Sequence, residues 1–77
     1  MNTNAITVSI LDRKYKLKVD STKTESLQHA AEMVDAVARK YGKMYGYQDY
    51  QDLLAMVALT QMERLLSIDD MLENSSL

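Results

Sequence analysis

Apolar and polar residues alternate along residues 5–19, the segment AITVSILDRKYKLKV. This alternation is typical of β-strands that bury one face. The chain is expected to reverse at Asp12-Arg13, because Asp accepts the positive φ of a two-residue turn better than most non-glycine residues. We therefore predict a β-hairpin with one apolar face. Its facing pairs are expected to be Ile10–Tyr15, Val8–Leu17 and Ile6–Val19.

The opposite face of the predicted hairpin is basic. It carries Lys14, Lys16 and Lys18, here called the lysine stripe, with Arg13 at the tip. In the same register the facing pairs are Leu11–Lys14, Ser9–Lys16 and Thr7–Lys18. Two interpretations stay open: a solvated face whose lysines discourage edge-to-edge aggregation, or a docking surface for an acidic partner.

A long helix is predicted over residues 22–45. Thr22-Lys23-Thr24-Glu25 fits a capping box at its start. Either Gly42 or Gly46 could supply a left-handed cap at its end. Apolar residues recur along it at steps of three and four, and they form a sector wide enough to cover both a sheet and another helix. The main stripe is Leu27, Ala31, Val34, Ala38, Tyr41 and Tyr45, beside Ala30, Met33, Val37 and Met44.

A second helix is predicted over residues 50–73, with Asp49 as its N-cap. Residues 53–59, LLAMVAL, are apolar around the whole circumference, and a chain of this size has too few elements to surround them. We therefore predict an α+β fold, a hairpin followed by two helices, assembled as an intertwined dimer. Beyond Leu59 the pattern narrows to a heptad seam, which predicts the start of a coiled coil. The expected oligomer interface is Leu54, Val57, Ala58, Gln61, Leu65, Ile68 and Leu72.

Composition limits the chemistry available to the chain. Its 77 residues allow one domain, and the absence of Cys removes disulfides and thiolate metal sites. His29 is the one histidine, and without a metal-binding companion we expect an ordinary helix residue. Asp69, Asp70 and Glu73 are expected to form a solvated face and not a cation site. We predict no enzyme activity, cofactor or metal.

Charge and hydropathy also limit the expected partners and location. The net charge is −2, so a global basic field for nucleic acid is missing. No apolar run approaches a membrane span, and the N-terminus lacks the features of a signal peptide, so the cytoplasm is expected.

Aromatic residues gather around the connection between the two predicted helices. They either cover the end of the helical core, with the hydroxyls in water, or form a partner-binding surface. The cluster consists of Tyr41, Tyr45, Tyr47 and Tyr50, with Lys40 and Lys43 among them.

Taken together, VSILDRKYKL, the long amphipathic helix and LLAMVALTQMERLL resemble the ZapA family of bacterial cell-division proteins. The resemblance covers about residues 6–72, and its motifs are moderately specific because they include no catalytic signature. Asp12 departs from the glycine that relatives often have in the turn. The long C-terminal coil of the family is mostly missing from this sequence.

The resemblance implies a cytoplasmic protein at the division site that binds FtsZ. It implies lateral association of FtsZ protofilaments, dimerisation through the globular region and pairing of dimers into tetramers through the coiled coil. Contact with FtsZ would fall at Arg13 and Lys16 of this sequence, with Lys14 and Lys18 beside them. Two alternatives remain: a dimeric ribbon-helix-helix regulator that inserts paired strands into DNA, or an oligomerisation adaptor for another complex.

Overall fold

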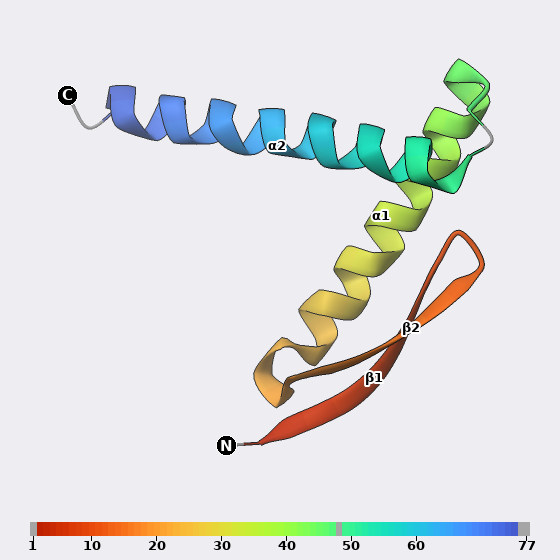
Figure 1. The fold of residues 1–77 in the computed structure, drawn as a ribbon. Helices are drawn as coiled ribbons and strands as arrows, with labels where there is room; N and C mark the ends of the chain where they lie inside the picture. The colour runs from red at the N-terminus through yellow and green to blue at the C-terminus, as the bar shows by residue number, and fades with distance from the viewer. Residues whose placement is uncertain (1, 48, 76–77) are drawn as a thin grey trace.

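The computed structural model describes residues 2–47 and 49–75, and it has the predicted α+β fold of a hairpin followed by two helices. Strands β1 (Thr3–Ile10) and β2 (Arg13–Asp20) are antiparallel, and a 3₁₀ turn, η1 (Ser21–Lys23), leads into α1 (Thr24–Tyr45). Helix α2 (Tyr50–Ser75) then projects away from the hairpin and from α1 (Figure 1). Both helices lie within two residues of the predicted limits, 22–45 and 50–73.

The predicted pairing of the hairpin is wrong by two residues. Leu11 and Asp12 form the turn with φ of 52° and 67°, so the turn precedes the predicted Asp12-Arg13 by one residue. A two-residue shift leaves the strand side chains beyond the turn on their predicted faces, because strand side chains alternate with a period of two. The apolar face is therefore confirmed, although its pairs differ. The observed pairs are Ile10–Arg13, Val8–Tyr15 and Ile6–Leu17 on that face, and Ser9–Lys14, Thr7–Lys16 and Ala5–Lys18 on the other.

Leu11 is the residue whose observed position differs most from the predicted one. We predicted it on the outer face opposite Lys14, but its side chain is buried, with 5% of its surface exposed. It packs in one cluster with Ala38 of α1 and with Leu53 and Val57 of α2. The tip of the hairpin is thereby tied to both helices.

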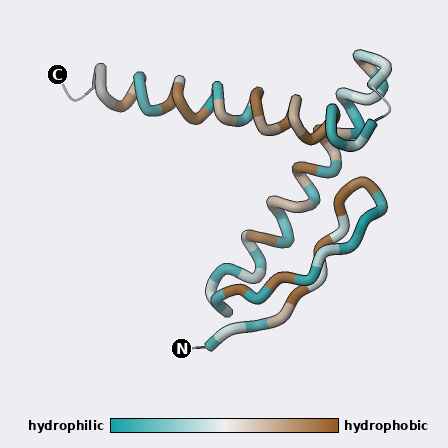
Figure 2. The backbone as a smooth tube through the Cα atoms, in the orientation of Figure 1, coloured by the Kyte–Doolittle hydropathy of each residue, from teal (hydrophilic) through white to brown (hydrophobic). Residues whose placement is uncertain are grey.

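A second apolar cluster joins the middle of the hairpin to α1. Ile6 and Val8 of β1 pack with Ala31, and the half-buried Leu27 lies against them. Hydrophobic positions alternate with hydrophilic ones along the hairpin and recur along both helices (Figure 2). Helix α1 packs mainly against β1. This packing agrees with the wide apolar sector that the sequence predicts for α1.

The ends of the helices follow local rules, with one prediction wrong. The capping box at Thr22 and Glu25 does not form: the Asp20 carboxylate accepts the Thr22 N–H at 3.0 Å, and no side chain caps α1. Asp49 caps α2 as predicted, because its Oδ1 accepts the Gln51 N–H at 2.7 Å. Gly46 ends α1 with φ of 71°, the left-handed conformation that glycine adopts at low cost.

The single chain is extended for its size. Its radius of gyration is 15.4 Å, whereas a compact domain of this length would have about 11.5 Å. Of the 53–59 segment, only Leu53 and Val57 are buried, and Leu59 is 63% exposed. Burial of this segment on all sides, which we predicted, is thus not achieved within one chain, and the dimer that would supply it remains a prediction.

Candidate functional site

The lysine stripe lies on the outer face of the hairpin, directed away from α1. Lys14, Lys16 and Lys18 are all exposed. None of the ion pairs among the described residues uses them. Strand β1 opposite is uncharged, so the paired strand does not neutralise the positive potential of this face. Asp20, at the end of β2, is the one carboxylate in the two strands, and it accepts hydrogen bonds from Thr22.

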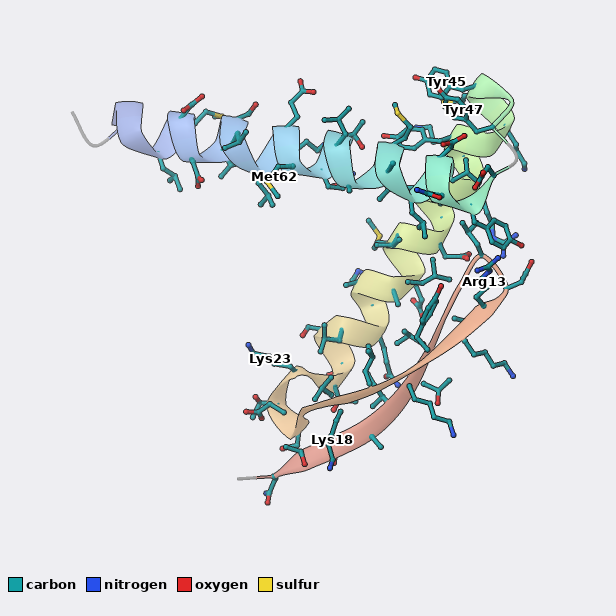
Figure 3. All side chains as sticks on the ribbon, viewed as in Figure 1. Arg13, Lys18, Lys23, Tyr45, Tyr47 and Met62 are labelled. Carbon is teal, nitrogen blue, oxygen red and sulfur yellow. The ribbon has the colours of Figure 1, made fainter. Side chains whose placement is uncertain are left out.

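Arg13 lies on the other face of the hairpin, apart from the lysine stripe. It pairs with Ile10, and its guanidinium carbon is 4.6 Å from the centre of the Tyr50 ring, within the range of a cation–π contact. Figure 3 shows Arg13 at the tip, near the start of α2, and Lys18 near the opposite end of the hairpin. Our prediction that Arg13 continues the stripe is wrong, because the turn ends one residue earlier than we expected.

Two carboxylates and one arginine hold the turn against α1. The Asp35 Oδ1 accepts the Leu11 N–H at 2.6 Å, and its Oδ2 accepts from the Arg39 Nε at 2.9 Å. Arg39 also donates through a terminal nitrogen to the Asp12 carboxylate at 3.0 Å. The bond from Arg39, and next the bond from Leu11, lower the pKa of Asp35 below its usual value, while the carboxylates raise the pKa of Arg39.

The sequence analysis missed Asp35 and Arg39. Their spacing of four residues on a helix was visible and is typical of an ion pair on one face. Their contact with the turn was not visible, because it depends on where α1 crosses the hairpin.

Part of the apolar face of the hairpin is uncovered. Tyr15 and Leu17 of β2 are 40% and 38% exposed, because α1 lies on β1 and leaves β2 open. Here an apolar hollow of about 220 Å³ lies between β2 and the start of α2. Its lining is Val8, Ile10, Tyr15, Leu17 and Leu54.

A second apolar groove, of about 350 Å³, lies where α1 and α2 cross. Its apolar lining comes mostly from α1. The lining residues are Ala30, Met33, Val34, Val37, Val57, Gln61 and Arg64.

The predicted heptad seam runs from the core outward along α2. Val57 is buried inside the single chain, Leu54 and Gln61 are half-buried, and Ala58 is exposed. Leu65, Ile68 and Leu72 are all more than half exposed. Other large apolar residues on this part of α2 are as exposed as the seam, namely Leu59, Met62, Leu66 and Met71.

The tyrosine cluster is divided between core and surface. The Tyr41 hydroxyl donates to the Thr60 Oγ1 at 2.9 Å. The half-buried Tyr41 ring packs against the cluster that Leu11 forms with both helices. Tyr45 lies 5.8 Å from Tyr41 and 6.0 Å from Tyr47, centre to centre, and is more than half exposed. Covering of the core thus accounts for Tyr41, whereas Tyr45 leaves its ring available on the surface.

The remaining candidate chemistry is sparse. His29 approaches Glu32 at 4.0 Å, and both side chains are mostly exposed. Within the described residues no three His, Cys, Asp or Glu side chains are grouped in a way that could hold a metal ion. In the same part of the chain, neither helix is long and apolar enough to cross a membrane.

Comparison with known proteins identifies the family. Residues 6–76 match the family model described as "Cell division protein ZapA". The chain belongs to the ZapA family. ZapA proteins are non-enzymatic, are associated with FtsZ and act in cell division at the septum, and these properties agree with the resemblance noted from the sequence.

One solved structure resembles the ZapA-like chain along most of its length. It is described as "Unknown conserved bacterial protein from Pseudomonas aeruginosa PAO1". The TM-score is 0.76 at 26% sequence identity, covering 95% of this chain and 80% of that one. No curated protein matches the chain in sequence.

Proposed function

We propose that this ZapA-family chain forms a twofold dimer in the cytoplasm that binds FtsZ through its hairpins and crosslinks FtsZ protofilaments at the division site. The observation that carries this proposal is the family match over residues 6–76. The hairpin and the exposed face of α2 supply the two surfaces that such a role requires, one for the filament and one for a second copy.

The case for a second copy rests on exposed apolar surface. Soluble monomers seldom expose a contiguous apolar patch larger than a few hundred Å². Here large apolar side chains follow one another along α2 from Leu59 to Leu72, and most of them are more than half exposed. The uncovered groove where α1 crosses α2 borders this face through Val57 and Gln61. A second α2 packed along the seam would cover both the face and the groove.

The case for the hairpin as the filament-binding element rests on charge. The whole chain is slightly acidic, yet β2 concentrates four basic residues within Arg13–Lys18. An acidic partner surface would therefore be attracted to this strand in particular. A dimer presents two such hairpins, and because a filament repeats its binding sites, two weak contacts give a much tighter attachment than one.

Charge reversal tests the hairpin. We expect Arg13→Glu with Lys16→Glu to abolish co-sedimentation with FtsZ while leaving the circular dichroism spectrum unchanged, since both side chains are exposed. Lys23→Glu with Lys40→Glu is the matched control, because it reverses the same number of exposed charges outside the hairpin. Normal co-sedimentation by the hairpin variant would remove these residues from the site.

The two single variants separate the faces of the hairpin. Lys16→Glu alters only the outer lysine stripe, whereas Arg13→Glu alters the face of the hairpin that Tyr50 of α2 contacts. If only one of them weakens binding, the filament contacts that face alone.

Self-pairing within one chain distinguishes this hairpin from the ribbon-helix-helix arrangement, in which the paired strands come from two chains. A gel shift with duplex DNA at low salt tests that alternative, since phosphate contacts are strongest there. We expect no shift, and a salt-sensitive shift would favour DNA binding instead.

A further inference from the structure

The turn of the hairpin is held in an unfavourable backbone conformation. Both of its residues have positive φ, 52° at Leu11 and 67° at Asp12, and neither is glycine. Both residues carry a Cβ that is crowded at positive φ, leucine more so than Asp, and glycine alone avoids this crowding. Such a conformation persists only where the surrounding contacts oppose its relaxation.

Two kinds of contact oppose relaxation here. The Leu11 side chain is buried among Ala38, Leu53 and Val57, which anchors the turn through apolar packing. In addition, two side chains of α1 hydrogen-bond to the turn: Asp35 accepts from the Leu11 N–H, and Arg39 donates to the Asp12 carboxylate. Arg39 joins both carboxylates, so removing it leaves Asp12 without its cation and Asp35 with only the Leu11 N–H.

We infer that Asp35 and Arg39 are positioning residues that hold the hairpin tip in the orientation in which Arg13 and the neighbouring Lys14 meet FtsZ. The inference rests on the proposed function. Arg13 directly follows the turn, so the φ values at Leu11 and Asp12 determine where its side chain leaves the strand. The held turn places Arg13 over Tyr50 and Lys14 on the outer face.

For Asp35, the geometry favours positioning over direct contact with the filament. Both oxygens of Asp35 already accept hydrogen bonds inside the chain, and its side chain is only 26% exposed. The carboxylate is therefore occupied by the turn and by Arg39.

Arg39→Gln tests the inference, with Lys40→Gln as the matched control on the next residue of the same helix. We expect the apparent Kd for FtsZ to rise about tenfold in Arg39→Gln, as it would if the binding orientation of the tip fell to one tenth of the population. The helical signal and the mass should not change. Binding equal to that of Lys40→Gln would overturn the inference.

A rescue variant distinguishes positioning from contact. Glycine adopts positive φ without steric cost, so adding Asp12→Gly to Arg39→Gln should restore most of the lost binding. If Arg39 touched FtsZ directly, glycine in the turn could not replace it, and the absence of rescue would overturn the positioning role.

Hydrogen exchange tests the same contact without FtsZ. We expect the Leu11 amide to exchange about tenfold faster in Asp35→Ala, where its acceptor is gone, and to be unaffected in Glu32→Ala, one turn earlier on α1. Unchanged exchange in Asp35→Ala would overturn the inference. Normal FtsZ binding by Arg13→Glu with Lys16→Glu would instead overturn the proposed binding site, so the two failures are distinguishable.

Discussion

The two halves of α2 differ sharply although they belong to one continuous helix. In the first half, Leu53 and Val57 are buried against α1 and the turn, and together with β1, β2 and α1 they form a unit that we call the head. In the second half, residues 61–72, called the arm, Met62, Leu65 and Ile68 have more than half of their surface exposed. The head buries an apolar core within one chain, although Tyr15 and Leu17 stay partly exposed, whereas the large apolar residues of the arm are all exposed and would need a second chain to cover them. In the proposed dimer, folding and association would thus depend on successive parts of one helix.

The largest effect that we expect is at the centre of the head. Val57→Asp would bury a carboxylate without a partner beside Leu11 and Ala38, at a cost of about 3 kcal/mol or more. That is a large fraction of the stability of a small domain. Circular dichroism should show loss of the cooperative fold, while Met62→Asp in the arm should keep the head folded. A well-folded Val57→Asp protein would contradict the assignment of this residue to the head.

The next effect concerns the arm. It should lower the mass of the assembly in solution and leave the fold of the head unchanged. Leu65→Asp should raise the dimer dissociation constant about 100-fold or more, because a symmetric interface would bury the new carboxylate twice. Ser67→Asp adds the same charge to an exposed position outside the predicted seam. Analytical ultracentrifugation at several concentrations measures both. Equal masses for the two variants would show that the seam does not join the chains.

A smaller effect is expected at the end of α1, where the chain turns toward α2. Gly46→Ala should lower the free energy of unfolding by about 1 kcal/mol, since alanine is strained at the φ of 71° found there. Gly42→Ala is the control: it lies inside α1, where alanine favours helix, and its added Cβ would meet the Tyr47 carbonyl oxygen at 3.4 Å. Thermal unfolding should place Gly46→Ala below Gly42→Ala, and the reverse order would contradict the cap.

The smallest effect is a pH dependence of the head. The folded state lowers the pKa of Asp35, so this carboxylate contributes stability that is fully present above its unfolded pKa and is lost as the pH falls through the folded one. Asp35→Asn should therefore flatten the acid side of the stability profile below about pH 4. Urea unfolding at pH 3 and pH 6 measures the difference. An unchanged profile would show that the ionised form of Asp35 does not stabilise the head.

The sequence predicted the elements well because each carried its own local signal. Alternation identified the hairpin, Gly46 and Asp49 marked the boundary between the helices, and steps of three and four placed Ala31 and Ala38 toward the core. These signals depend on neighbours in sequence, and so they could be seen without tertiary structure.

The register and the contacts of the tip could not be predicted in the same way. Shifts of two residues keep the same faces, so alternation alone could not choose between Asp12-Arg13 and Leu11-Asp12 as the turn. What distinguishes them is the burial of Leu11 between two helices and its bond to Asp35, which lies 24 residues away in sequence. The same uncertainty misplaced Arg13 relative to the lysine stripe.

Because α2 extends straight beyond the head, its length would set the distance between the heads of two chains joined through their arms. Antiparallel pairing of two arms would place the hairpins at opposite ends of the assembly, and their separation would then grow with helix length, at 1.5 Å for each added residue. An insertion of seven residues would add about 10 Å while keeping the apolar seam in phase. A variant lengthened by whole heptads would then hold neighbouring filaments at a larger separation while keeping the same head.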